Sequence, residues 1–375
     1  MPEKKKSVVP PLRFPEFRDA GEWERYRFRE LLTLEYGASL PEESRLGGAI
    51  PVVGSNGVVG FHNQALISGP AIIVGRKGSV GEINWIELDC YPIDTTFYVK
   101  LESQDTLLAF IKLLLENANL TCLSDNGAVP GLNRNDVYVL KTALPREAEQ
   151  QKIADCLSSL DEVIDLEAQK LEALKAHKKG LMQQLFPREG ETTPRLRFPE
   201  FRDEGEWERY RFRELLTLEY GASLPEESRL GGAIPVVGSN GVVGFHNQAL
   251  ISGPAIIVGR KGSVGEINWI ELDCYPIDTT FYVKLESQDT LLAFIKLLLE
   301  NANLTCLSDN GAVPGLNRND VYVLKTALPR EAEQQKIADC LSSLDEVIDL
   351  QTQKLDALKA HKKGLMQQLF PSEVD

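Results

Sequence analysis

The sequence predicts an α+β protein in which two mixed α/β domains are separated by two long antiparallel coiled-coil helices, with pseudo-two-fold symmetry. Two observations predict this fold. Residues 12–187 recur as residues 196–371 at a constant offset of 184, with four differences over 176 positions. The last part of each copy, residues 147–185 and 331–369, carries an apolar heptad pattern. A repeat this long is a whole domain with an additional element, because solenoid repeats are much shorter.

The repeat sets the domain boundaries, and each half is long enough to bury a core of its own. The expected segments are an N-terminal tail (1–11), domain 1 (12–146), a first helix (147–187), a linker (188–195), domain 2 (196–330), a second helix (331–371) and a C-terminal tail (372–375). The four differences are Ala20 with Glu204, Glu167 with Gln351, Ala168 with Thr352, and Glu172 with Asp356. Residues 30–146 and 214–330 are therefore identical.

The charge of the chain limits the classes of partner. Its 41 Lys and Arg against 55 Asp and Glu give a formal net charge of −14. Such a chain repels a polyanion at long range, so nonspecific coating of nucleic acid is disfavoured. A local basic face that reads DNA remains compatible with this charge.

Cysteine usage and hydropathy indicate a cytoplasmic protein. Cys90, Cys122 and Cys156 are each copied once, and none has the spacing of a zinc site. We expect free thiols packed as structural residues in a reducing compartment. No apolar run approaches the roughly 20 residues of a membrane span, so we expect no membrane partner.

Within one domain, residue patterns predict a sheet with one packed helix. The proline-rich and aromatic residues 12–17, followed by Trp23, suggest an extended segment pinned to a core. Short apolar runs separated by glycine predict strands. Residues 106–117 have helical apolar spacing. The expected strands are residues 50–53, 58–61, 71–74, 80–83, 93–99 and 137–140.

From residue 147 the pattern changes to a helix that pairs along its length. Apolar residues alternate at spacings of four and three, which is a period of 3.5. Residues 147–185 would form a rod of about 58 Å. The expected pairing residues are Leu160, Ile164, Glu167, Leu171, Leu174, Lys178 and Leu181, with Leu344, Ile348, Gln351, Leu355, Leu358, Lys362 and Leu365 in the copy.

The obvious partner of each helix is its copy. One antiparallel register places Glu167 beside Lys362 and Lys178 beside Gln351. The same register pairs Ile164 with Leu365 and Leu171 with Leu358. The alternative is that Glu167 and Lys178 are exposed charges that interrupt the apolar seam.

No catalytic motif is found in the sequence. Residues 54–60 and 75–81 are rich in glycine but lack the GxxxxGK[ST] pattern, and strands rather than helices follow them, so hairpin turns are the better interpretation. The base-gripping tetrapeptide of amino-methyltransferases and the acidic-x-Lys element of a common nuclease core are missing. His62 has no GxSxG or HExxH companion and is expected at a surface or turn. An enzyme is therefore disfavoured, and no metal or cofactor is expected in this chain.

Polar residues in the glycine-rich segments are suited to contacts with bases and phosphates. Asn and Gln bind adenine, Arg and Lys bind guanine, and Ser binds phosphate. The alternative for each is a role in turn conformation. The candidates are Ser55, Asn56, Asn63, Gln64, Arg76, Lys77, Ser79, Asn126, Asn133 and Arg134, with Ser239, Asn240, Asn247, Gln248, Arg260, Lys261, Ser263, Asn310, Asn317 and Arg318 in the copy.

Several segments together resemble the specificity subunit of type I restriction-modification systems. They are Leu-Arg-Phe-Pro-Glu-Phe from Leu12 with Trp23, the glycine-rich runs 50–60 and 73–81, the run Leu-Pro-Arg-Glu-Ala-Glu-Gln-Gln-Lys-Ile from Leu144, and residues 160–164 and 180–186. The resemblance covers essentially the whole chain. It implies two target recognition domains that read double-stranded DNA, held apart by conserved helices. It also implies docking of two methyltransferase subunits that use S-adenosylmethionine, together with motor-nuclease subunits, and no catalysis in this chain.

The identity of the two domains departs from the usual pattern of this family. Its members usually carry two different recognition domains and read an asymmetric bipartite site. Two identical domains related by a two-fold axis would read the same half-site on opposite strands, which predicts a bipartite, palindromic target. The proposed helix overlap of residues 160–185 spans roughly 39 Å, close to one DNA turn of about 34 Å. The rival interpretation is a non-DNA coiled-coil interaction scaffold with two ligand-binding domains.

Overall fold

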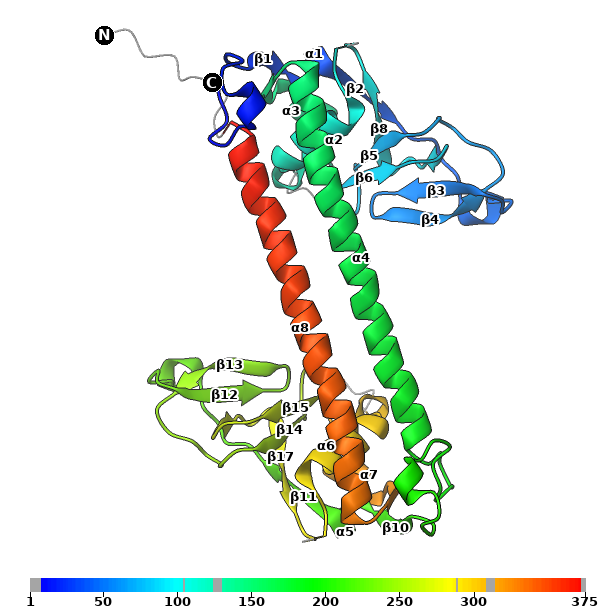
Figure 1. Ribbon diagram of the computed structural model, residues 1–375, viewed down its shortest axis with the longest axis vertical. Helices are drawn as coiled ribbons and strands as arrows, with labels where there is room; N and C mark the ends of the chain where they lie inside the picture. Colours follow the sequence, from blue (N-terminus) through cyan, green and yellow to red (C-terminus); the bar gives the residue numbers. More distant parts are fainter. Residues whose placement is uncertain (1–7, 104, 124–129, 288, 308–313, 372–375) are drawn as a thin grey trace. The chain divides into compact units, whose positions relative to one another are not determined.

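The computed structural model describes residues 8–103, 105–123, 130–287, 289–307 and 314–371 (Figure 1). The chain forms two compact units. Unit 1 contains residues 1–168 and 353–375, and unit 2 contains residues 169–352. Each unit therefore combines one α/β domain with the first part of one long helix and the last part of the other.

Unit 1 contains every element type of the repeat. Its strands are β1 (Glu24–Arg27), β2 (Leu32–Tyr36), β3 (Ile50–Gly54), β4 (Gly57–His62), β5 (Ala71–Gly75), β6 (Ile83–Ile86), β7 (Tyr91–Pro92), β8 (Thr96–Leu101) and β9 (Lys141–Leu144). Its helices are α1 (Phe28–Leu31), α2 (Leu108–Asn117) and α3 (Arg134–Val139), and α4 (Glu147–Leu185) begins here.

Unit 2 repeats these elements. Its strands are β10 (Glu208–Arg211), β11 (Leu216–Tyr220), β12 (Ile234–Gly238), β13 (Gly241–His246), β14 (Ala255–Gly259), β15 (Ile267–Ile270), β16 (Tyr275–Pro276), β17 (Thr280–Leu285) and β18 (Lys325–Leu328). Its helices are α5 (Phe212–Leu215), α6 (Leu292–Asn301) and α7 (Arg318–Val323), followed by α8 (Glu331–Leu369).

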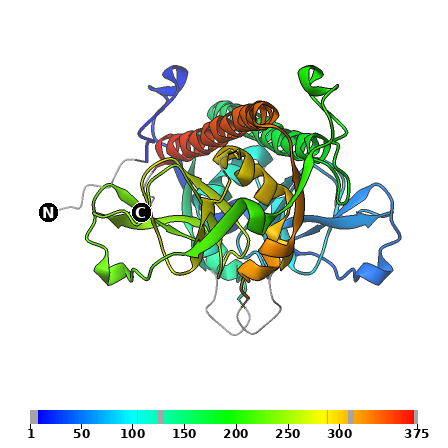
Figure 2. The ribbon, with the colours of Figure 1, turned by 90° about the horizontal axis from the view of Figure 1, so that it is seen from below.

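Each domain contains three small sheets. In domain 1 the strand orders are β2-β8-β5-β6, β4-β3-β7 and β1-β9, and domain 2 has the equivalent orders. Strand β5 lies inside its sheet and every residue of it is buried, which explains its uninterrupted apolar run. The β3–β4 hairpin lies on the side of domain 1 away from α4 in both views (Figures 1 and 2).

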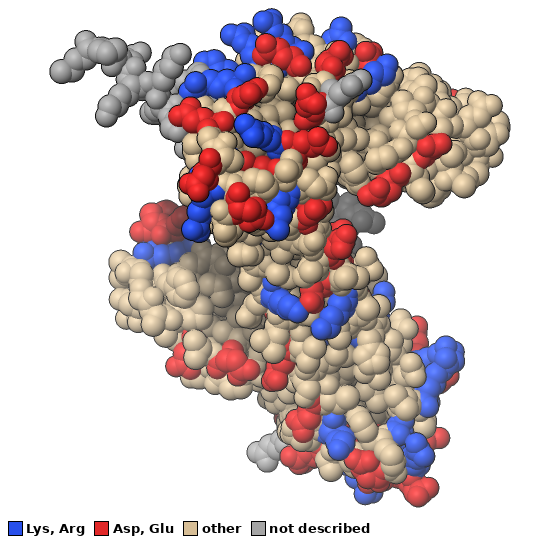
Figure 3. All heavy atoms as spheres, turned by 45° about the horizontal axis from the view of Figure 1, so that its top comes forward, with Lys and Arg blue, Asp and Glu red and all other residues tan. Residues whose placement is uncertain are grey.

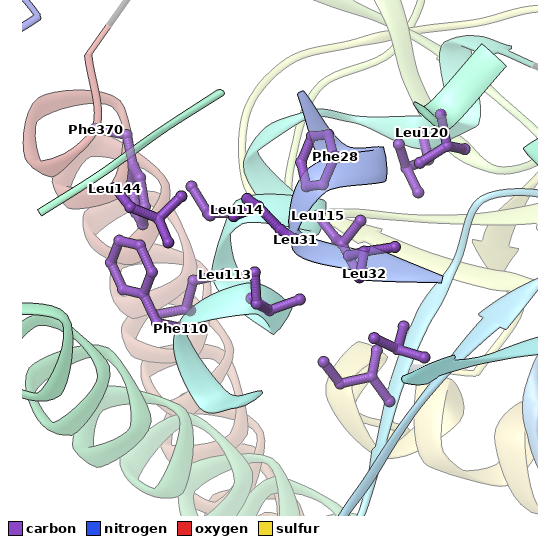
Figure 4. Close-up of a cluster of buried hydrophobic side chains, with 14 of the residues drawn as sticks. Phe28, Leu31, Leu32, Phe110, Leu113, Leu114, Leu115, Leu120, Leu144 and Phe370 are labelled. Atoms are coloured by element: carbon purple, nitrogen blue, oxygen red, sulfur yellow. The ribbon is translucent and has the colours of Figure 1, made fainter. Parts of the chain in front are cut away.

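The core of each unit includes the C-terminal end of a long helix. In unit 1, Phe370 follows α8 and packs against Phe110 of α2, with ring centroids 5.6 Å apart (Figure 4). It also packs against Trp23, at 6.1 Å between ring centroids. In unit 2, Phe186 follows α4 and stacks on Phe294 of α6 at 5.5 Å. The two domains therefore depend on segments that lie far away in the sequence.

Burial along α4 follows the predicted heptad pattern. Helix α4 spans the predicted residues 147–185, and every predicted pairing position on it is buried or half-buried. Val163 and Leu166 lie off this seam and are exposed, Leu166 by 64%. Position in the heptad therefore decides which side chains are buried, and hydrophobicity alone does not. Glu167 and Lys178 lie on the seam side and do not simply interrupt it.

The helices are antiparallel within unit 1, but the predicted register is wrong. Lys362 of α8 pairs with Asp161 of α4 at 2.6 Å, and Glu167 pairs with Lys354. Asp161 lies six residues before the predicted partner Glu167, about 9 Å along the helix. In unit 2, Lys178 pairs with Asp345 at 2.6 Å, and Asp345 lies six residues before the predicted partner Gln351.

A third helix explains the shift in register. In unit 1, α2 brings Glu116 to 3.5 Å from Lys362 and Lys112 to 3.2 Å from Asp161. Burial acts to lower the pKa of Lys112, but attraction to Glu116 and Asp161 outweighs this and raises it. Charged residues between the two long helices, such as Asp161 and Lys362, thus find some of their partners on α2 of the domain. The heptad pattern alone does not predict these partners.

The start of α4 is held by a buried polar clamp. Glu149 accepts hydrogen bonds from Arg13 Nε at 2.7 Å and Nη2 at 2.6 Å, and this bonding raises the pKa of Arg13. Gln150 accepts from the Leu107 backbone N–H and donates to the Pro145 carbonyl. The Glu-Gln pair at the start of the helix therefore joins the N-terminal segment and the domain to α4. Arg197, Glu333 and Gln334 repeat it in unit 2.

Two strand predictions are wrong. Residues 80–82 form a turn and β6 begins only at Ile83, because Gly81 has φ +79° and a Cβ there would lie 2.4 Å from the Thr121 nitrogen. Residues 137–140 belong mainly to α3, whose N-terminus Asn133 caps by accepting from the Asn135 N–H. A helix of six residues is too short to show a clear periodicity. No local pattern predicted β1, α1, β2, β7 or β9.

Two side-chain predictions also need correction. His62 is 7% exposed rather than at the surface, and its Nδ1 accepts from the Leu46 N–H at 3.2 Å. It ends β4 and turns inward against Tyr91, at 5.7 Å between ring centroids. The six cysteines are free thiols. Burial raises the pKa of Cys90 to about 11, whereas Cys122 is exposed and so is not a packing residue.

Glu149→Ala should destabilise the protein because it leaves Arg13 as an uncompensated buried charge. Loss of one partner from a buried ion pair costs about 3–5 kcal/mol. Urea titration followed by circular dichroism would measure this loss. The control is Lys152→Ala, which removes an exposed ion pair with Glu16 one turn further along α4. Equal effects of the two variants would contradict the clamp.

Candidate nucleic-acid interface

Three predicted segments of domain 1 meet at one surface. They are the β3–β4 turn at Ser55, the loop after β5 at Arg76 and Lys77, and the residues before α3. The Leu132 N–H donates to the Arg76 carbonyl at 2.9 Å, and Lys77 forms an isolated β-bridge with Gly131. Segments that lie far apart in the sequence therefore present their polar residues together.

Glycine at position 75 makes this approach possible. A Cβ on Gly75 would lie 2.0 Å from the Ser79 carbonyl oxygen and 3.2 Å from Ser55 Cβ. A Cβ on Gly78, whose φ is +79°, would lie 3.1 Å from Ser55 Oγ. The glycine-rich runs are therefore hairpin turns and close contacts, which confirms their interpretation as turns.

Two aromatic residues form the base of this surface. Arg76 Cζ lies 5.1 Å from the ring centroid of Tyr36 and 5.9 Å from that of Phe97. Arg134 Cζ lies 5.2 Å from the same Tyr36 ring. Tyr36 is half exposed and was missed by the sequence analysis. Its one sequence signal, an aromatic residue before Gly37, is weak.

Only some of the other candidates lie at this surface. Asn56 and Lys77 are exposed at the surface where the segments meet, and Ser79 is half-buried there. Asn63 and Gln64 follow the far end of β4, about 20 Å along the strand from the turn, and do not join the cluster. Asn133 already caps α3. Asn126 and Asn310 lie outside the described residues.

Domain 2 repeats the same arrangement. The Leu316 N–H donates to the Arg260 carbonyl at 2.9 Å, and Lys261 bridges to Gly315. Ser239 lies against Gly259 as Ser55 does against Gly75. Asn240 and Ser263 accompany this cluster, Asn247 and Gln248 lie beyond the far end of β13, and Asn317 caps α7.

The cluster carries positive charge without a paired carboxylate. Over the described ranges, none of the ion pairs includes Arg76, Lys77 or Arg134. On the helices, by contrast, basic side chains stand among acidic ones (Figure 3). Three cations left without counter-ions in a chain of net charge −14 favour an anionic ligand.

The described part of the chain contains no group of three His, Cys, Asp or Glu residues arranged to bind a metal ion. Its helices include none that is long and apolar enough to cross a membrane.

The model of the type I restriction modification DNA specificity domain matches the chain twice, over residues 20–176 and 204–360. Because these matches cover most of the chain, the protein belongs to this family. Its members are specificity subunits, which are in general non-catalytic.

Curated relatives and solved structures agree with this assignment. The type I restriction enzyme MjaVIII specificity subunit of Methanocaldococcus jannaschii is 23% identical over 311 residues, covering 74% of this chain and 73% of the relative. The putative MjaX specificity subunit of the same organism is 22% identical over 260 residues, covering 65% of this chain and 61% of the relative's length.

The type I S subunit from M. genitalium has the same fold, with a TM-score of 0.71 at 17% identity, over 98% of this chain and 100% of that one. A chain from a structure concerned with complex assembly and conformational transition of the type I R-M system has a TM-score of 0.51 at 15% identity, over 94% and 98%.

Proposed function

We propose that this chain is the sequence-specific DNA-recognition subunit of a type I restriction-modification complex. The observation that carries the proposal is the convergence, in both domains, of three polar segments on one uncompensated cationic surface. The non-DNA scaffold explains the long helices but gives no reason for this surface. Family membership supports DNA as the anion.

The helices provide surfaces for partner subunits. Val163 and Leu166 on α4 and Val347 and Leu350 on α8 are exposed apolar residues, and Leu166 and Leu350 are about two-thirds exposed. Apolar side chains in this exposed setting favour protein contacts. We therefore propose that two methyltransferase subunits dock along the helices and bind S-adenosylmethionine, with motor-nuclease subunits joining the complex. Methylation and cleavage would belong to these partners.

Identical recognition surfaces imply a symmetric target. Residues 30–146 and 214–330 have the same sequence, so both domains prefer the same bases. Two identical domains related by the two-fold axis that the repeat predicts would read the same half-site on opposite strands. The proposed target is therefore a bipartite inverted repeat.

Long-read sequencing of DNA modified by the assembled methyltransferase should reveal a palindromic bipartite motif. The expected motif carries the same half-site on both strands, separated by a spacer of constant length. A nonpalindromic motif would refute the proposed symmetry.

Arg76→Ala combined with Arg260→Ala should weaken binding of the methylation target, because each change removes one cation from the cluster. We expect the affinity to fall by about tenfold or more at moderate salt. Fluorescence anisotropy with a labelled duplex would measure it.

The matched control for this pair is Arg18→Ala with Arg202→Ala, which removes the same charge from exposed positions that directly follow short 3-10 helices. The control should bind normally and both variants should keep the melting temperature of the parent. Unchanged affinity of the Arg76 and Arg260 variant would remove these residues from the interface.

A further inference from the structure

Each domain holds two arginines against a single tyrosine ring. In domain 1, the Cζ atoms of Arg76 and Arg134 lie 5.1 and 5.2 Å from the centroid of Tyr36. In domain 2, those of Arg260 and Arg318 lie 5.3 and 5.1 Å from the centroid of Tyr220. The distances lie within the range of cation–π attraction, so the ring holds both guanidinium groups.

Hydrogen bonding alone does not set the position of these arginines. Arg260 donates from Nε and Nη2 to the Asp278 carbonyl at 3.2 and 2.6 Å. In domain 1, by contrast, the buried Nε of Arg76 has no hydrogen-bond partner in the described part of the chain. The stacking distances agree in the two domains while the hydrogen bonds differ. The tyrosine ring is therefore the constant element that positions the guanidinium group.

Packing against neighbouring residues fixes the position of the tyrosine ring. Tyr36 pairs with Phe97 across β2 and β8, and their ring centroids are 5.0 Å apart. The next residue, Gly37, packs so closely that a Cβ there would lie 2.1 Å from the Ile93 carbonyl oxygen. The Arg76 backbone N–H donates to the Thr95 carbonyl at 2.9 Å. The ring and the first arginine thus have little freedom to separate.

Two like charges at one ring repel each other, and this repulsion favours binding of an anion. Neither arginine has a carboxylate partner among the ion pairs of the described residues. Within the described residues, Arg134 donates a single long hydrogen bond of 3.4 Å, from Nη1 to the Leu34 carbonyl. Donors therefore remain available on both guanidinium groups. A phosphate accepts such donors in pairs, with charge-assisted hydrogen bonds.

We propose that Tyr36 and Tyr220 are positioning residues that hold each arginine pair as a clip for one phosphate group of the DNA backbone. The proposal rests on the proposed function. Both arginines are half-buried, so their guanidinium groups extend only a short way beyond the protein surface. Base edges, by contrast, lie deep in the groove of DNA. The exposed Asn56 and Lys77 beside them are better placed to reach bases. The clip would therefore set the register of the domain on DNA.

The test compares three paired variants in the assembled methyltransferase complex. They are Tyr36→Leu with Tyr220→Leu, Tyr36→Phe with Tyr220→Phe, and Arg134→Met with Arg318→Met. The probe is a labelled random-sequence duplex of about 30 base pairs, titrated from about 50 to 200 mM salt. A duplex carrying the methylation motif serves as the second probe.

The phenylalanine pair keeps the aromatic face and should bind both duplexes like the parent. The leucine pair should bind both duplexes about tenfold more weakly, and equally so, because recognition of a phosphate is independent of sequence. The methionine pair should also make the plot of log affinity against log salt shallower, by about 0.9 for each phosphate that the protein no longer neutralises.

Several outcomes would overturn the clip. Parental affinity of the leucine pair would refute the positioning role while leaving DNA recognition intact. Normal binding to the random duplex with a relaxed methylation motif would assign the arginines to base reading instead. If the leucine pair does not fold, an unchanged salt slope in the methionine pair is the refuting result. Failure of the parent complex to bind either duplex would instead refute the proposed function.

Discussion

The structure depends on the burial of helix segments inside the domain cores. In unit 1, Ile153 and Leu157 of α4 and Leu369 and Phe370 at the end of α8 belong to one core with α2 and Trp23. Truncating a buried aromatic residue such as Phe370 costs about 3–5 kcal/mol, a large share of the stability of a domain. Because the domain is packed on both helices at once, its polar surface is held at a defined place on the helix pair.

Polar contacts make this packing specific. The Arg13–Glu149 clamp fixes where α4 begins, and the network of Lys112, Glu116, Asp161 and Lys362 fixes how α2 meets the helix pair. Apolar heptads alone allow shifts along the seam, since one leucine layer resembles the next. Half-buried charges restrict such shifts, because an unpaired partner carries a desolvation cost.

The sequence predicted what local patterns encode and missed what tertiary contacts decide. The 3.5-residue period predicted α4, and glycine spacing predicted the turns and the strands β3, β4, β5 and β8. The predicted register of the two long helices is wrong because Lys362 pairs with Asp161 and Glu116. Glu116 belongs to α2, which is not part of the heptad pattern. The clustering of Ser55, Arg76 and Arg134 depends on close approach at Gly75, which no spacing reveals. Tyr36 was missed because its role comes from neighbours that are distant in the sequence.

The central claim is that both domains meet DNA with the same cationic surface. A cryo-EM map of the assembled methyltransferase bound to its target duplex tests this most directly. DNA density should lie against Ser55, Arg76 and Arg134 in domain 1. It should also lie against Ser239, Arg260 and Arg318 in domain 2. One phosphate should lie at the arginine pair beside Tyr36 and one at the pair beside Tyr220. DNA lying on a different face of either domain would contradict it.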